Sequence, residues 1–300
     1  MNQIACQGQR RIRAYRLPAS IGAVLALIAL ISAPRAVAQT APNSTPTPAT
    51  SSAPAAPSDP CSSLMAIVNR PSFGTGVCTV RPDHVDLENG YTNLVTVGGA
   101  NTISYPQSLL RIGTFDPHLD FEVGPVTENH SSSLGLPVDG MSDLGFGAKY
   151  ELGYSSRALW GVNASFTVPT GSPAFGGGNA TFTGNFNWGY TLNSEFSASG
   201  TLGFNALSAY NAGGVPQSYF AFTPTIALTA ALPGGPSQIS AEYAYFSSAG
   251  PNLGSKSFVD VFYQRDFGQH VQIDIEYGFQ PSFIPGQRQH YAGAGISFMN

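Results

Sequence analysis

The stretch Ser142–Tyr154, SDLGFGAKYELGY, divides its residues into two sets at alternate positions. Apolar residues occupy one set, and charged residues or glycines occupy the other. The first set is Leu144, Phe146, Ala148, Tyr150, Leu152 and Tyr154, and the second is Asp143, Gly145, Gly147, Lys149, Glu151 and Gly153. Successive side chains of a β-strand point to opposite faces. The stretch therefore predicts a strand with one apolar face and one face that is polar or empty.

The same period of two recurs in twelve stretches between His84 and the end of the sequence. These stretches centre on residues 85–91, 110–112, 119–123, 144–154, 160–168, 181–190, 196–205, 220–232, 239–245, 259–263, 271–279 and 291–298. With their flanks, most are about as long as the 9–11 residues that a tilted strand needs to cross a bilayer. Twelve is also an even number, as bacterial outer-membrane barrels require.

The links between the stretches alternate in length. Short turns fall near residues 116–117, 155–157, 191–193, 233–235 and 268–269, and longer links cover 98–106, 126–141, 169–177, 207–216, 247–255 and 282–287. Outer-membrane barrels show this alternation, with short turns in the periplasm and long loops outside. We therefore expect an all-β fold: a transmembrane antiparallel β-barrel of about 12 strands over residues 84–300, with both of its ends on the periplasmic side.

A soluble β-sandwich or barrel is the rival interpretation, because its strands also alternate. Such a fold needs an outer surface rich in charge. Charged residues make up only 10% of this chain, against about 25% in soluble domains. The apolar faces also run the full length of nearly every stretch. The composition therefore favours the membrane barrel, in which closure satisfies the edge hydrogen bonds.

The N-terminal region predicts export. Four arginines between residues 10 and 16 precede the uncharged run Leu17–Ala33, and Ala36-Val-Ala38 follows as a small-residue cleavage site. This order predicts a signal peptide over residues 1–38. A retained membrane anchor is the alternative, but the run is short for a spanning helix and contains Pro18. Residues 39–60 are mainly Pro, Ala, Ser and Thr, and we expect a disordered linker.

Export and a barrel together predict the Gram-negative cell outer membrane as the location. The expected partners are then outer-membrane lipid, the barrel-assembly machinery and a small-molecule solute. Without residues 1–38, eight basic residues face seventeen acidic ones, a net charge of −9. Such a chain is not suited to neutralising phosphates, so we expect no nucleic-acid partner.

Cys61 and Cys78 are the two cysteines that follow the linker. An exported protein meets an oxidising compartment, so we expect a disulfide rather than two free thiols. We interpret residues 61–83 as a short periplasmic segment closed by this bond. Whether the segment plugs the barrel is a question that the sequence leaves open. Two cysteines without a nearby histidine pair do not indicate a metal site, and we expect neither metal nor cofactor.

Twelve charged residues fall on positions that the alternation turns toward the barrel interior. They are Asp86, Glu88, Arg111, Asp120, Glu122, Lys149, Glu151, Glu195, Glu242, Asp260, Asp274 and Glu276. Ionisable groups at membrane depth face water or each other. Two interpretations stay open: these groups line an acidic, water-filled pore that disfavours anions, or they pair with each other and stabilise the wall.

Six short motifs stand out along the sequence: Asn69-Arg70-Pro71, Tyr105-Pro106, Leu110-Arg111-Ile112-Gly113, Gly140–Leu152, Val168–Ser172 and Tyr291–Phe298. With these motifs the chain resembles a family of bacterial outer-membrane transporters grouped with the phenol meta-pathway degradation (MetA-pathway-like) proteins. The resemblance implies an outer-membrane barrel with a role in transport, and it brings no catalytic residues. Assembly signals of such barrels commonly end on an aromatic residue. Phe298 is aromatic and lies on the apolar set of alternate positions, although two further residues follow it.

Three functions are consistent with these features. A channel for passive passage of small solutes comes first, and the family label suggests aromatic or hydrophobic compounds. An outer-membrane lipid hydrolase is the second, because His130-Ser131 could belong to a Ser/His site. The third is a closed barrel that anchors or displays, with the Cys61–Cys78 loop in its lumen. We expect no enzyme, because no catalytic motif stands out.

Overall fold

The computed structural model describes residues 59–133, 136–211, 213–281 and 288–300, so the expected signal peptide and nearly all of the linker lie outside it. In these residues the chain forms one short helix, α2 (Leu64–Ile67), and thirteen strands. The strands are β1 (Val85–Thr96), β2 (Asn101–Gly113), β3 (Leu119–Ser133), β4 (Leu136–Met141), β5 (Leu144–Tyr154), β6 (Ala158–Val168), β7 (Thr181–Thr191), β8 (Phe196–Tyr210), β9 (Pro216–Ala231), β10 (Ser237–Phe246), β11 (Lys256–Phe267), β12 (Val271–Phe279) and β13 (Gln289–Met299). Among the described residues, no helix is long and apolar enough to cross a membrane.

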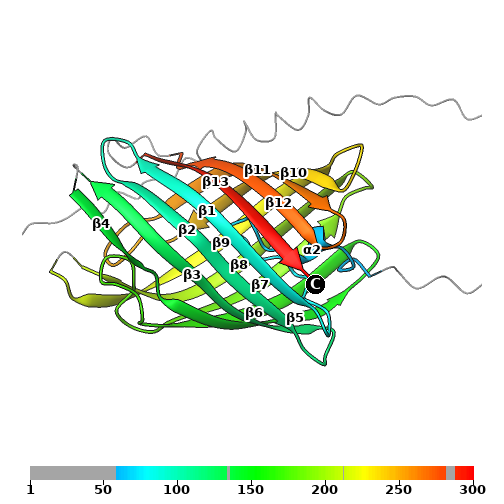
Figure 1. Cartoon of the computed structure of the whole chain (residues 1–300), viewed down its shortest axis with the longest axis horizontal. Helices are drawn as coiled ribbons and strands as arrows, with labels where there is room; N and C mark the ends of the chain where they lie inside the picture. The colour runs from blue at the N-terminus through cyan, green and yellow to red at the C-terminus, as the bar shows by residue number, and fades with distance from the viewer. Residues whose placement is uncertain (1–58, 134–135, 212, 282–287) are drawn as a thin grey trace, which may run out of the picture. The chain divides into compact units, whose positions relative to one another are not determined.

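The sheet closes on itself, because the first strand pairs with the last (Figure 1). Leu87 of β1 lies opposite Phe298 of β13, and all neighbouring strands run antiparallel. Leu119–Val123, at the start of β3, pairs with β5, and Glu128–Ser133, at its end, pairs with β4. β4 and β5 therefore act as two parts of one strand of the barrel. The expected antiparallel barrel of twelve strands is confirmed.

Two stretches that we expected as loops are strands. β2 begins at Asn101, inside the expected link 98–106, and the expected link 126–141 contains the end of β3 and all of β4. Side chains here are bonded across strands by polar contacts, such as Thr102 to Ser131 at 2.9 Å and Ser104 to Asn129 at 2.7 Å. Because polar residues hold this hairpin, the hydrophobic period did not reveal it.

The barrel is apolar outside and polar inside. Large apolar side chains stay exposed on the outward positions of every side of the barrel, among them Phe121, Leu152, Phe166, Phe182, Phe204, Ile226, Val261, Ile275 and Phe298. Buried positions carry Asn187, Thr201, Gln264 and several charges instead. This is the reverse of a soluble barrel, and only lipid makes such an outer surface favourable. The fold is that of an outer-membrane protein.

Residues 61–83, which we call the plug, lie inside the barrel at the end that carries the short turns. Cys61 and Cys78 form the expected disulfide. Around it, Ile67 and Val80 are buried with both cysteines, and Leu159 of β6 packs against them. The sequence predicted a short disulfide-closed segment here and left open whether it plugs the barrel. In the structure its residues pack against and bond the inner wall.

Candidate functional site

Arg111 of β2 joins the plug to the barrel wall. Its side chain is fully buried, and its guanidinium donates hydrogen bonds to the carbonyls of Ile67 and Cys78, the latter at 2.9 Å. The same guanidinium lies 2.6 Å from the Asp120 carboxylate and 3.5 Å from that of Glu122. One cation therefore holds two points of the plug and neutralises acids on the neighbouring strand.

Wall carboxylates accept hydrogen bonds from the plug backbone. Glu88 accepts the N–H groups of Asn69 and Arg70, each at 3.1 Å. Asp120 accepts the N–H of Val80 at 2.8 Å, and Asp266 accepts the N–H of Met65 at 3.1 Å. Hydrogen bonds to a charged acceptor are stronger than neutral ones. The inner acids thus satisfy the backbone of a segment that has little regular structure of its own.

Glu242 of β10 holds the tip of the plug. Its carboxylate accepts the Ser72 hydroxyl at 2.8 Å, the Phe73 N–H at 2.7 Å and the Gly74 N–H at 2.9 Å. Glu242 is buried, and no cation lies within 4.0 Å of it among the described residues. Three donors from one turn of the plug therefore stabilise a carboxylate that lacks an ion-pair partner.

The Arg70 side chain extends from the plug to the part of the wall formed by β12, β1 and β2. Its guanidinium lies 3.4 Å from Asp274 and 4.0 Å from Glu276, and it donates to Gln107 at 3.0 Å. A Cβ added at Gly90 of β1 would fall on this guanidinium. The glycine on the inner face therefore leaves room for a side chain that comes from the plug.

Eleven of the twelve charged residues that we expected in the interior lie on the inner wall. Nine of them are buried: Asp86, Glu88, Arg111, Asp120, Lys149, Glu151, Glu242, Asp260 and Asp274. The side chains of Glu122 and Glu276 are 11% and 7% exposed. Glu195 has the inward parity of β8 but lies in the turn before this strand and is exposed. Its expected place in the lumen is therefore corrected: the strand begins at Phe196, one residue after Glu195.

The inner wall also contains residues that sequence reasoning missed. Phe246, Phe258 and Tyr291 point inward and meet Phe73 of the plug, with ring centroids 5.3–5.9 Å from that of Phe73. In β11, apolar residues fall on both faces: Val259 and Val261 on one, and Phe258 and Phe262 on the other. The apolar inward positions of β11 were the signal for this cluster.

Three cavities border the plug, and neighbouring cavities share lining residues. The loop-side cavity, whose lining includes Leu94, Thr102 and Lys256, has a volume of about 670 Å³. The turn-side cavity, whose lining includes Met65, Ser197 and Gln238, has a volume of about 350 Å³. Between them lies a middle cavity of about 210 Å³. Phe73 and Phe246 line both the loop-side and the middle cavity, and Thr201 and Thr225 line both the middle and the turn-side cavity.

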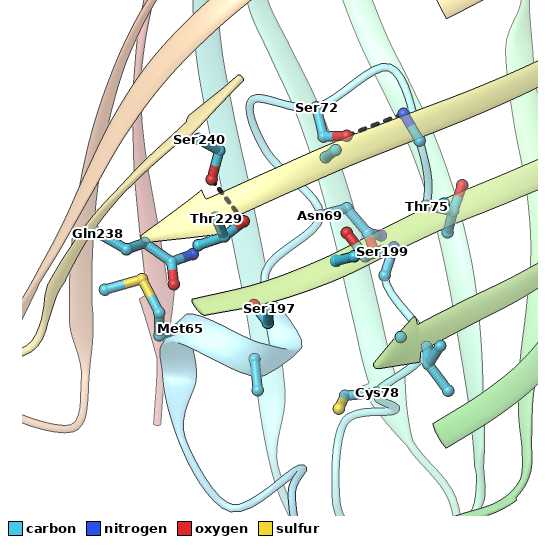
Figure 2. A pocket seen from close by; sticks show the side chains of 18 of the residues that line it. Met65, Asn69, Ser72, Thr75, Cys78, Ser197, Ser199, Thr229, Gln238 and Ser240 are labelled. Carbon is cyan, nitrogen blue, oxygen red and sulfur yellow. Dashed lines mark hydrogen bonds between the residues drawn. The ribbon is translucent and has the colours of Figure 1, made fainter. Parts of the chain in front are cut away.

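Figure 2 shows the turn-side cavity between the plug and the strands β8 to β10. Met65, Ser72 and Thr75 of the plug face Ser197, Ser199, Thr229, Gln238 and Ser240 of the wall. The wall side chains here are small or uncharged. Thr229 and Ser240 bond each other across strands at 2.8 Å. The side chains of this wall that bond the plug are Thr201 of β8 and Glu242 of β10.

A sequence profile of the family described as "Putative MetA-pathway of phenol degradation" matches residues 68–298. This match covers more than three quarters of the chain. The chain belongs to this family. No curated protein sequence gives a significant match.

Solved outer-membrane barrels are similar to the chain in fold. An outer-membrane channel from Pseudomonas putida F1 aligns with a TM-score of 0.60 at 11% identity, over 75% of this chain and 98% of that one. The KdgM porin aligns with a TM-score of 0.45 at 12% identity, over 70% and 98%. The CymD monoaromatic hydrocarbon channel gives 0.40 at 10% identity, over 74% and 89%.

Three of the motifs that carried the family resemblance, those with Asn69-Arg70, Arg111 and Lys149, meet at the plug. Asn69 and Arg70 bond Glu88, as described above, and the Asn69 side chain accepts a hydrogen bond from the Lys149 ammonium at 2.7 Å. Arg111 and Lys149 both approach Glu122, at 3.5 and 3.8 Å. Motifs that lie as far as 80 residues apart in the sequence therefore build one docking site for the plug.

The Ser/His pair of the hydrolase hypothesis is not assembled. His130 lies on β3 with its ring 2.9 Å from Asp139 and 3.2 Å from the Tyr105 hydroxyl. Ser131 follows directly on the same strand and bonds Thr102. Neighbouring residues of a strand point to opposite faces, so His130 does not reach the Ser131 hydroxyl. The geometry offers no activated serine here.

One group of donor atoms has the spacing of a metal site. Ligand atoms of Asp59, Cys61 and Glu151 lie within 4.8 Å of one another. The Cys61 sulfur, however, is bonded to Cys78, and Arg81 lies 2.5 Å from Asp59 and 3.4 Å from Glu151. A disulfide sulfur is not a thiolate ligand, and the guanidinium already neutralises both acids.

Proposed function

We propose that this protein is an outer-membrane channel that passes small solutes by passive diffusion through its barrel, beside a docked plug. The observation that carries the proposal is the succession of three cavities along the barrel, in which neighbouring cavities share the lining pairs Phe73/Phe246 and Thr201/Thr225. Outer-membrane channels with a polar interior conduct along such a lumen. Membership of a family named for phenol degradation supports aromatic compounds as one solute class.

The path that we propose follows the wall formed by β7 to β9. The inward positions along it carry Thr183, Asn185, Ser199, Thr201, Thr223 and Thr225, which are uncharged, whereas Glu242 of the next strand, β10, bonds the tip of the plug. The charged wall on the other side is engaged with the plug. We therefore propose that most of the inner acids hold the plug in place and contribute little to selectivity along the path.

Along the proposed path, Thr75 of the plug bonds Thr201, which lines both the middle and the turn-side cavity. The Thr75 N–H donates to the Thr201 hydroxyl at 2.9 Å, and this hydroxyl donates to the Thr75 carbonyl at 3.3 Å. Few other bonds join the plug to β8. A small outward movement of the plug at Thr75 would join the middle cavity to the turn-side cavity.

Replacing Thr201 by Trp tests this path. The larger side chain would fill the junction of the two cavities, so we expect the single-channel conductance and the swelling rate of solute-loaded liposomes to fall severalfold. Leu202→Trp is the matched control, because Leu202 is the next residue of β8 and faces outward, 38% exposed. Absence of conductance and flux in the folded wild-type barrel would contradict the channel itself. Equal conductance in Thr201→Trp and wild type would contradict the path.

We propose no enzymatic activity for the chain. The support is the arrangement around His130, where the neighbouring serine lies on the other face of β3. A lipase assay of the wild type and of His130→Ala is the corresponding test. Hydrolysis by the wild type that disappears in the variant would overturn this view.

A further inference from the structure

The loop-side cavity has a wall of aromatic rings that belong to both the plug and the barrel. The Phe73 ring stacks on Phe258 with centroids 5.3 Å apart, and Tyr291 meets both rings edge-on at 5.8 and 6.0 Å. Phe73 is 40% exposed although it lies inside the barrel, because its free face borders the cavity. Rings arranged in this way can accept a further ring in stacked or edge-to-face contact.

The Tyr291 ring is held in a fixed position. Its hydroxyl donates to the Asp260 carboxylate at 2.6 Å, and a Cβ added at Gly278 on the neighbouring strand would overlap the ring. The absence of a side chain at Gly278 therefore lets Tyr291 lie across the inner wall. The aromatic surface of the cavity is pre-formed, which is the usual state of a small-molecule site.

Lys256 supplies an ammonium group beside these rings. Its Nζ lies 5.3 Å from the Phe246 centroid and 5.5 Å from that of Phe258. Among the described residues, no carboxylate lies within 4.0 Å of this Nζ. Lys256 is half-buried and lines the cavity. A cation in such a place lacks an anion that would compensate its partial desolvation.

The other charged groups of the loop-side cavity already have partners. Arg70 and Glu276 face each other at 4.0 Å. Glu88 accepts two plug N–H groups and lies 3.6 Å from Arg111. Lys256 is therefore the charge of this cavity that is available to a ligand. The cavity volume of about 670 Å³ is within the usual range of about 300–1,000 Å³ for ligand pockets.

From this geometry we infer that the loop-side cavity binds a small aromatic carboxylate, with the carboxylate on the Lys256 ammonium and the ring against Phe73, Phe258 and Tyr291. The charge on Lys256 selects the anion, and the stacked rings select a planar aromatic body over a saturated one. The inference rests on the proposed channel function, because it makes this cavity the first binding point of the path.

Calorimetric titration of the full chain in detergent with benzoate tests the inference. We expect benzoate to bind the wild type and Lys256→Met to bind it at least about tenfold more weakly, because a charge-assisted contact is lost. Arg265→Gln is the matched control: Arg265 belongs to the same strand and also lies over a ring, Phe267, but it is exposed. Its affinity for benzoate should equal that of the wild type.

Two further ligands separate the contributions of charge and ring. Cyclohexanecarboxylate keeps the charge without the aromatic ring, benzyl alcohol keeps the ring without the charge, and we expect both to bind more weakly than benzoate. The inference is overturned if the folded wild type does not bind benzoate, if Lys256→Met binds it as the wild type does, or if either comparison ligand binds equally well. The titration is done in detergent, so benzoate binding can be absent while conductance persists, and that result would contradict only the inferred binding site. Benzoate binding by a protein that shows no conductance would contradict only the channel.

Discussion

Arg111 shows how one buried side chain can serve several strands and the plug together. It is fully buried and lies within 4.0 Å of carboxylates from β1 and β3. Removing one partner from a buried ion pair leaves the other charges uncompensated. The residue is therefore more important for stability than its distance from the cavities suggests.

For Arg111→Met we expect a loss of about 3–5 kcal/mol in the free energy of unfolding, the usual cost of breaking a buried ion pair. Urea titration of the detergent-solubilised protein measures it. Arg157→Met, at an exposed position in the turn after β5, should change the free energy by no more than about 0.5 kcal/mol. A variant at Arg111 as stable as the control would show that the cluster is not a stabilising element.

Gly90 makes room for Arg70, and Gly90→Ala tests this directly. The added methyl group would overlap the Arg70 guanidinium, so we expect a loss of about 1–3 kcal/mol, as for other overpacked sites. Gly184→Ala is the control, because the nearest atom to its Cβ would be 3.9 Å away. Equal stability of both variants in the same urea titration would contradict the assigned position of Arg70.

At the scale of elements, the plug depends on wall carboxylates for its hydrogen bonds. In Glu242→Gln a neutral amide with one acceptor oxygen replaces a charged group that accepts three bonds. We expect the amides of Phe73 and Gly74 to exchange hydrogen at least about tenfold faster, since a bond to a charged acceptor contributes about 1.5–3 kcal/mol. Hydrogen-exchange mass spectrometry measures this rate.

Glu195→Gln serves as the control for that experiment. Glu195 is exposed in the turn before β8, so its replacement should leave the exchange of the plug amides unchanged. Unchanged exchange in Glu242→Gln as well would mean that Glu242 does not hold the tip of the plug.

The strands were predictable and the plug was not, for a physical reason. A strand in lipid must alternate along its whole length, so the period of Leu144–Tyr154 is visible in one short stretch. The plug has no period, because its backbone bonds side chains such as Glu88 and Glu242 and forms no sheet. The sequence predicted the disulfide from two cysteines in an exported chain, but nothing in residues 61–83 indicates which surface they cover.

The inner charges illustrate the same limit at the candidate site. Alternation placed Lys149 and Asp274 on the inner wall, but it could not distinguish an acidic pore from paired charges. Their partners Asn69 and Arg70 belong to the plug, about 80 and 200 residues away in sequence. Only the folded chain brings these groups together, and it shows that several of the acids bond the plug.

At the scale of the whole molecule, the barrel has apolar side chains outside and polar ones inside, the reverse of a soluble protein. The plug occupies part of its lumen. Lipid covers the apolar outer surface, while the charged inner wall and the plug satisfy each other. In the proposed function this leaves a path along β7 to β9, and its width depends on where the plug lies. We therefore expect the conductance to depend on the plug as much as on the barrel.

The most direct test is the single-channel conductance of the wild type and of a chain lacking residues 61–83, measured in planar bilayers under identical conditions. We predict a small conductance for the wild type and a severalfold larger one for the deletion, because the plug occupies the lumen beside the path. The same conductance in both folded proteins, or none in either, would contradict a channel that is restricted by its plug.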